Sequence, residues 1–226
     1  MSRQRGDGRA VELCLAVSCC VLLCLAVRAL APHTGKMRVL LKDVLDCDPD
    51  AAWRAIRSPA VFREVSSPLF TVESMTPDGF PTIWEPGEHQ VSLRGLGLVP
   101  LGSQIIKLSV EVVSSTDPKL GAVRILRDTG RPVSGPLASV SLWDHRMAIS
   151  AAPGNPNTTL YRDQLKFGAG AITLPMWPAF WSFWQWRMHQ LKRLAPSWRF
   201  DVGVDAPPEV DVAVGQGLGP DSGSDI

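Results

Sequence analysis

A histidine and an aspartate are the residues of this chain whose types and spacing could do acid–base chemistry. His145 lies in the stretch 139–150 and Asp163 in the stretch 158–167, and in both the odd positions are the more apolar ones. Alternate residues of a strand share a face, so both side chains are expected to point inward. The turn at 153–157 then places His145 directly or diagonally opposite Asp163 on a neighbouring strand.

Such a pair has two interpretations. A carboxylate can orient an imidazole for proton transfer, which makes His145 and Asp163 the candidate acid and base. The same groups can instead satisfy each other's hydrogen bonds as structural residues, and we favour this second interpretation. The sequence contains no Gly-rich phosphate loop, no pair of catalytic carboxylates and no serine elbow beside them.

An aromatic segment follows the second of these stretches. Four of the eight tryptophans and two of the seven phenylalanines lie between positions 177 and 186. A helix over 174–194 places most of these rings on one stripe that would pack against a sheet. Phe183 and Trp186 fall off that stripe, and Arg187, Gln190 and Arg193 are expected on the polar far side.

The expected ligand-binding side chains come from the strands and from this helix. They are Trp84, Trp143, His145, Met147, Tyr161, Asp163, Trp177, Trp181, Trp184 and Met188.

Composition excludes several classes of function. The net charge is +1, with 23 basic and 22 acidic residues, so nothing suggests a nucleic-acid partner. Four of the five cysteines lie between positions 14 and 24, and only Cys47 belongs to the body of the chain. No spacing of Cys and His resembles a zinc site, and no cofactor is expected.

The N-terminal segment, 1–36, is basic and then apolar. Residues 11–31 are a marginal length for a membrane-spanning helix, and they also fit a cleaved signal peptide. Translation could instead start at Met37 rather than Met1. The basic residues that follow the segment favour a cytoplasmic body if residues 11–31 anchor it in a membrane.

The body, 37–198, predicts an α+β fold. A strand over 38–46 precedes two short helices that begin with Asp48-Pro49 and Ser58-Pro59. Six further strands are expected at 69–75, 82–94, 103–114, 123–128, 139–150 and 158–167. A seven-stranded antiparallel sheet with one long helix must curl around that helix. The acidic tail, 199–226, is rich in Gly, Pro and Ser and is predicted to be disordered.

This order resembles the helix-grip fold of the SRPBCC superfamily, which includes START-like and polyketide cyclase-like proteins. The resemblance is carried by the residues around Asp48 and Trp53, by Trp143-Asp-His145-Arg-Met147, by Tyr161-Arg-Asp163 and by the aromatic helix. The chain departs from it at Met147, where many relatives have a second histidine. The resemblance implies an apolar cavity between sheet and helix, and it leaves the chemistry open.

The leading hypothesis is therefore binding of a hydrophobic or amphipathic small molecule, lipid- or polyketide-like, without catalysis. One alternative is a cyclase- or dehydratase-like enzyme that uses His145 and Asp163. Another is docking of the Trp-rich helix on a membrane or on a partner, which includes a second copy of the chain. The apolar connection 95–102 is expected to be a cavity lid, a membrane-touching or partner-touching tip, or ordinary packing on the helices.

Overall fold

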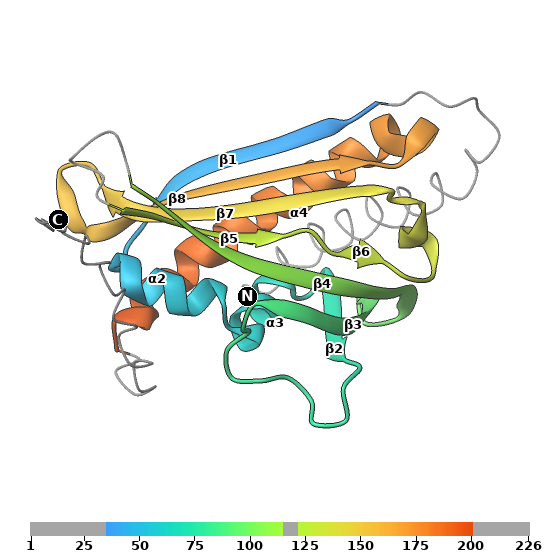
Figure 1. Ribbon diagram of the computed structural model, residues 1–226, viewed down its shortest axis with the longest axis horizontal. Coiled ribbons are helices and arrows are strands. Elements are labelled where there is room, and N and C mark those ends of the chain that lie inside the picture. The colour runs from blue at the N-terminus through green and yellow to red at the C-terminus, as the bar shows by residue number, and fades with distance from the viewer. Residues whose placement is uncertain (1–34, 115–121, 201–226) are drawn as a thin grey trace, which may run out of the picture.

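The computed structural model describes residues 35–114 and 122–200, and in them an antiparallel sheet curls around one long helix (Figure 1). The sheet runs in the order β1-β8-β7-β5-β4-β3-β2, and the short β6 pairs with β4. The strands are β1 (Met37–Leu45), β2 (Phe70–Ser74), β3 (Gly87–Gly95), β4 (Val99–Ser114), β5 (Ala122–Asp128), β6 (Arg131–Pro132), β7 (Leu142–Ala152) and β8 (Asn155–Gly168). The helices are α2 (Pro49–Ile56), α3 (Pro59–Ser66) and α4 (Thr173–Leu194), with 3-10 turns at Pro136–Ser139, Gly170–Ile172 and Ala195–Phe200. This is the predicted helix-grip arrangement.

The two short helices begin where the sequence predicted. The Asp48 carboxylate accepts hydrogen bonds from the backbone N–H groups of Asp50 and Ala51, at 3.0 and 2.8 Å. The Ser58 hydroxyl accepts from the N–H of Val61 at 3.5 Å. In both helices proline occupies the first turn, where its missing N–H costs no hydrogen bond.

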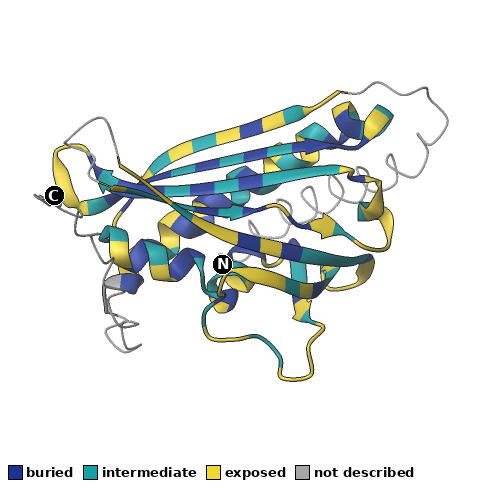
Figure 2. Cartoon of the chain, in the orientation of Figure 1, coloured by how far each residue is buried: buried dark blue, intermediate teal, exposed yellow. Residues whose placement is uncertain are grey.

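The core lies between the concave face of the sheet and the helices. Burial alternates along β1, β7 and β8, as expected for strands with one face covered (Figure 2). Tyr161 and Ile149 are fully buried in one apolar cluster, and Leu165 and Phe167 in a second. α4 packs along the inner side of this sheet and contacts β1, so it covers both clusters.

The strand predicted over 82–94 begins five residues later than expected, and the one predicted over 139–150 begins at Leu142. A strand was expected from Thr82, but β3 starts at Gly87. Pro81 and Pro86 lack the N–H that a sheet ladder needs. The segment between them is instead held against the end of α2, because the N–H of Trp84 donates to the carbonyl of Arg57 at 2.8 Å. Trp84 therefore enters the core from a loop.

The apolar connection 95–102 comprises the last residue of β3, a tight turn at 96–98 and the start of β4. Leu98 at its tip is 82% exposed, whereas Leu101 is buried. Leu96 has a φ of 52°, an uncommon conformation for a non-glycine residue in a tight turn. At Gly102 a Cβ atom would lie 1.9 Å from the carbonyl oxygen of Ser134, so only glycine fits this close approach of two chain segments.

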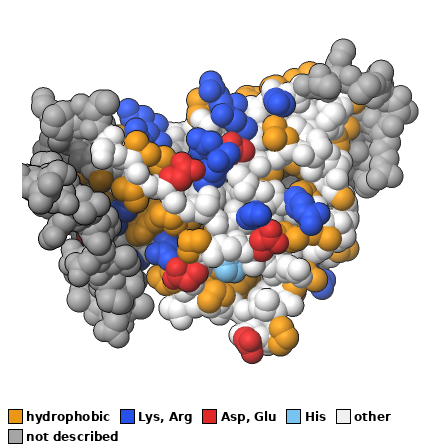
Figure 3. All heavy atoms as spheres, viewed as in Figure 1, with side chains coloured by type: hydrophobic (Ala, Val, Ile, Leu, Met, Phe, Trp, Pro, Cys, Tyr) orange, Lys and Arg blue, Asp and Glu red, His pale blue; other side chains and the backbone are white. Residues whose placement is uncertain are grey.

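The outer surface mixes charges of both signs. Figure 3 shows basic and acidic side chains interspersed on the face in view. Arg127 pairs with Asp144 at 2.7 Å, and Arg124 pairs with Asp50 at 2.7 Å. This arrangement agrees with the nearly neutral composition.

Two of the predicted segments fall outside the described residues. Positions 1–34 of the basic and apolar segment 1–36 are outside them, and so are positions 201–226 of the acidic tail 199–226. In the part of the chain that the structure describes, no helix combines the length and apolar character that crossing a membrane requires. Membrane association through residues 11–31 and a homodimer stay predictions.

Candidate ligand-binding site

Asp163 is the centre of a buried hydrogen-bond cluster between β7, β8 and α4. Its Oδ1 accepts from His145 Nε2 at 2.7 Å and from Trp184 Nε1 at 2.9 Å. Its Oδ2 accepts from the Tyr161 hydroxyl at 2.8 Å and from Arg187 Nη1 at 3.0 Å. All five residues are at most 7% exposed, so four donors saturate a carboxylate that water does not reach.

Strand register brings the histidine and the aspartate together. On β7 and β8, His145 is opposite Leu165 and Met147 is opposite Asp163. His145 and Asp163 are therefore diagonal neighbours on the same face, which confirms the predicted geometry. Tyr161 is two residues before Asp163 on β8 and points the same way.

The electrostatics of the cluster keep Asp163 ionised. Burial by itself raises the pKa of a carboxyl, but the neighbouring His145 and Arg187, together with the donated hydrogen bonds, outweigh it and hold the pKa of Asp163 well below its usual range. Burial also raises the pKa of the Tyr161 hydroxyl well above its usual value, so this group stays a donor. Asp163 is thus a fixed acceptor and Arg187 its counter-ion.

The hydrogen bonds determine which nitrogen of His145 carries a proton. An ionised carboxylate only accepts, so Nε2, at 2.7 Å from Asp163, must be protonated. Arg187 Nη1 also lies 3.1 Å from Nε2, but it cannot donate there and instead donates to Asp163 Oδ2. In a neutral ring Nδ1 then carries the lone pair. Nδ1 has no hydrogen-bond partner among the described residues.

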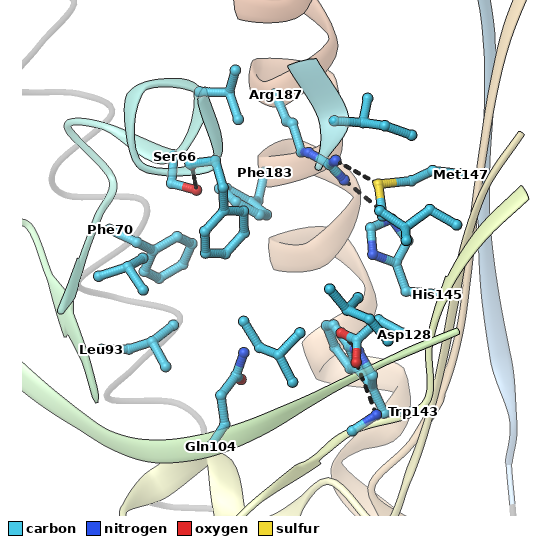
Figure 4. Close-up of a pocket in the computed structure, with 18 of the residues that line it drawn as sticks. Ser66, Phe70, Leu93, Gln104, Asp128, Trp143, His145, Met147, Phe183 and Arg187 are labelled. Atoms are coloured by element: carbon cyan, nitrogen blue, oxygen red, sulfur yellow. Dashed lines mark hydrogen bonds between the residues drawn. The ribbon is translucent and has the colours of Figure 1, made fainter. Parts of the chain in front are cut away.

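A cavity of about 120 Å³ adjoins this cluster, between the sheet and the helices α3 and α4. Figure 4 shows Phe70 and Leu93 on one wall and Trp143, His145 and Met147 on the opposite wall. The ring of His145 faces this space (Figure 4). The lining is mainly apolar, which is the usual form of a small-molecule site.

Asp128, at the end of β5, is a second buried carboxylate and lines the cavity. Its Oδ1 accepts from the backbone N–H groups of Lys107 and Gly130, at 3.0 and 2.9 Å. Its Oδ2 accepts from Trp143 Nε1 at 3.0 Å (Figure 4). A Cβ atom at Gly130 would lie 1.9 Å from the carbonyl oxygen of Ile105. Only glycine therefore fits at the position whose N–H donates to Asp128.

Five of the ten expected ligand-binding residues line the cavity, and five do not. The lining residues are Trp84, Trp143, His145, Met147 and Trp184. Tyr161 and Asp163 lie behind His145 in the buried cluster, and Met188 is buried in the core. Trp177 donates to the carbonyl of Arg38 at 3.1 Å, and Trp181 is 44% exposed.

The prediction was wrong for one face of α4, which was expected to face solvent. Arg187 was expected on the polar far side, but it is 5% exposed and reaches the cluster of Asp163. Phe183 was expected beyond the reach of the sheet, yet it lines the cavity and packs edge-on against Phe70, with ring centres 4.7 Å apart. Trp186 donates to the carbonyl of Ser67 at 3.0 Å. α4 is therefore turned toward α3 and β2, so that Trp177 and Trp181 move to the edge.

One signal in the sequence points to Arg187. A carboxylate buried in an apolar face needs a cation or several donors. Arg187 is three residues after Trp184, so it lies next to the aromatic stripe on the helix surface. Asp128 has a weaker signal, because it ends a strand and precedes Gly130 by two residues, which is typical of a turn.

The described residues contain no group of three or more His, Cys, Asp or Glu side chains that could hold a metal ion.

Comparison with known proteins finds similarity only among solved structures. No family model matches the sequence, and no curated protein matches it. An aromatase/cyclase from Streptomyces sp. R1128 is 10% identical, with 72% of this chain and 94% of that chain covered and a TM-score of 0.49. Norcoclaurine synthase from Thalictrum flavum is 8% identical, with 73% and 88% covered and a TM-score of 0.47. A START superfamily protein from Mycobacterium smegmatis is 11% identical, with 72% and 99% covered and a TM-score of 0.43.

Proposed function

We propose that this chain, which has the helix-grip fold of the START-like proteins, binds a hydrophobic or amphipathic small molecule between its sheet and α4. The ligand occupies the cavity lined by Phe70, Leu93, Phe183 and the face of β7. The chain holds this molecule without converting it.

The observation that carries the proposal is the apolar cavity itself. At about 120 Å³ it has room for on the order of ten water molecules. Aliphatic and aromatic side chains offer such waters few hydrogen bonds. An apolar molecule that replaces them gains roughly 25 cal/mol for each Å² of apolar surface buried.

The state of Asp163 supports binding over catalysis. A general acid or base must exchange a proton with its substrate and lie within hydrogen-bond reach of it. Asp163 accepts four hydrogen bonds, is 2% exposed and does not line the cavity. It serves to position His145 and to neutralise Arg187.

One observation favours the cyclase- or dehydratase-like alternative. His145 lines the cavity, and its Nδ1 has no partner in the described part of the chain. In an enzyme of this kind His145 would accept a proton from the substrate, and Asp163 would orient the ring through Nε2. Of the acid–base pair expected from the sequence, only His145 would then exchange a proton with the substrate.

Native mass spectrometry of the full chain, followed by solvent extraction, tests the binding function. We expect a non-covalent mass excess that extraction releases as an apolar compound. Leu93→Trp fills the cavity and should abolish the excess. The matched control is Val112→Trp at a 65% exposed position of β4, which should retain it. If purified protein carries no compound and binds no apolar probe, or if Leu93→Trp retains the compound, the proposal is wrong.

The same compound separates a binding protein from an enzyme. The extracted molecule is incubated with fresh protein and then analysed by mass spectrometry. We expect its mass and structure to be unchanged. A loss of water or a new ring, abolished by His145→Phe, would establish the enzymatic alternative instead.

A further inference from the structure

The polar groups that face the cavity are dominated by hydrogen-bond acceptors. His145 is only 7% exposed. Its ring presents Nδ1 to the cavity, and this atom is an acceptor in the neutral ring. Asp128 presents a carboxylate that has three donors and room for one more on Oδ2. The amide of Gln104 points into the same space and has no partner among the described residues (Figure 4).

Most donors near the cavity are already in use or are covered by the protein. Trp143 Nε1 donates to Asp128, and Trp184 Nε1 donates to Asp163. Arg187 uses Nη1 on Asp163 and Nη2 on Met147 Sδ, at 3.0 Å each. The Ser66 hydroxyl donates to the carbonyl of Phe62 at 2.7 Å. Trp84 Nε1 and Arg187 Nε have no hydrogen-bond partner among the described residues, but both atoms are fully covered by the protein. A ligand group that needs donors therefore finds the amide of Gln104 and the exposed guanidinium of Arg131.

With a neutral His145 ring, the buried charges of Asp163, Arg187 and Asp128 sum to a negative value. Arg187 and Asp163 are an ion pair at 3.0 Å and cancel each other. Asp128 is 6% exposed, and no salt bridge neutralises it within the described residues. Arg131 also lines the cavity, but it is exposed, so water screens its charge. A second carboxylate brought into this space would be repelled by Asp128.

We propose that the cavity selects uncharged apolar molecules that carry a hydroxyl group, which donates to Nδ1 of His145, over molecules of the same shape that carry a carboxylate. This inference rests on the proposed binding function and names its ligand class. The Gln104 amide lines the same cavity as a further polar group. The rest of the molecule lies against Phe62, Phe70, Leu93 and Phe183.

Three probes that share a 4-propylphenyl frame and differ in one polar group test this selectivity on the unaltered chain. They are 4-propylphenol, 4-propylanisole and 4-propylbenzoate, titrated at neutral pH with binding followed by calorimetry. The phenol donates a hydrogen bond, the anisole only accepts, and the benzoate is an anion. We expect the phenol to bind about threefold to tenfold tighter than the anisole, the usual value of one net hydrogen bond. The benzoate should bind more weakly than both.

The outcomes separate this inference from the binding function. If none of the three probes binds, the proposed binding function fails. If the anisole binds as tightly as the phenol, or the benzoate binds tightest, the cavity binds apolar molecules but the hydroxyl selectivity is wrong.

Two variants assign the selectivity to its residues. His145→Phe removes the acceptor and should abolish the advantage of the phenol over the anisole, while the affinity for the anisole reports that the cavity is intact. Asp128→Asn removes the negative charge and should bring the benzoate closer to the anisole. A phenol advantage that survives His145→Phe with anisole binding unchanged would overturn the assignment to Nδ1.

Discussion

Asp163 and Asp128 are two buried carboxylates beside one cavity, and different parts of the chain hold them. Asp163 is bound only by side chains, which come from β7, β8 and α4. Asp128 is bound by two backbone N–H groups and one indole. Asp163 has a buried cation as its partner, whereas Asp128 has none within the described residues. The first carboxylate ties the helix to the sheet, and the second ties neighbouring strands to each other.

The comparison shows two ways of keeping a charge in an apolar interior. An ion pair compensates charge with charge, and it fails when either partner is removed. Backbone donors compensate charge with dipoles and leave a net field, which can act on a ligand. Asp163 is therefore expected to matter most for stability, and Asp128 for the selectivity of the cavity.

The largest effect is expected when the counter-ion of Asp163 is removed. Arg187→Met leaves a buried carboxylate without its cation, which should lower the free energy of unfolding by about 3–5 kcal/mol. Arg193→Met is the matched control, because Arg193 pairs with Glu64 at 3.6 Å on the surface and should cost less than about 1 kcal/mol. Urea denaturation measures both. Equal costs would mean that Arg187 does not stabilise the cluster through its charge.

A second replacement should recover part of that loss. In Asp163→Asn combined with Arg187→Met, the amide oxygen can accept from His145 and Trp184, and the amide nitrogen can donate to the Tyr161 hydroxyl. The double variant is expected to be about 1–3 kcal/mol more stable than Arg187→Met alone. If the two losses simply add, the interaction of Asp163 with Arg187 is not the source of the effect.

Acidification should act through the same residue. The pKa of Asp163 lies well below its usual range in the folded chain, so the unfolded chain binds the proton more readily. The stabilisation is complete above about pH 5, where the unfolded carboxyl is ionised, and is lost as the pH falls toward the folded value. Denaturation at several acidic pH values should show a steeper loss for the wild type than for the double variant. Parallel curves would contradict this.

The smallest expected effect is the difference in stability loss between two tryptophan replacements. Trp184→Phe removes a donor to Asp163, and Trp143→Phe removes a donor to Asp128. Trp184 is 3% exposed and Trp143 is only half-buried, so the first replacement should cost about 1 kcal/mol more than the second. Thermal unfolding of both variants measures this. A larger cost for Trp143→Phe would reverse the ranking of the two carboxylates.

Much of the fold could be predicted from local pattern. Period-two alternation identified the strands that became β7 and β8, and Asp48-Pro49 and Ser58-Pro59 identified the starts of α2 and α3. The prediction failed at Thr82–Pro86, where the structure has no strand. Proline removes ladder donors there, and a long-range bond from Trp84 to Arg57 replaces them.

The candidate site was only partly accessible to the same reasoning. His145 and Asp163 share an inward parity, so their meeting could be predicted from two strands and a short turn. Arg187 and Phe183 could not be placed in this way, because an aromatic helix with rings on nearly every side has no single apolar face. Asp128 was missed because two of its three donors are backbone groups, which leave no side-chain pattern.

The amino-acid sequence by itself determined the order of the elements, the inward faces of the strands and the location of the aromatic helix, because these follow from side-chain periodicity and local capping. Only the tertiary structure decided how α4 is rotated on the sheet, and with it that Arg187 neutralises Asp163 while Trp181 lies at the surface. The reason is that a buried carboxylate must find its cation across the fold. That requirement of charge, together with packing against Phe70 and α3, selects one rotation of the helix among several that its aromatic rings would allow.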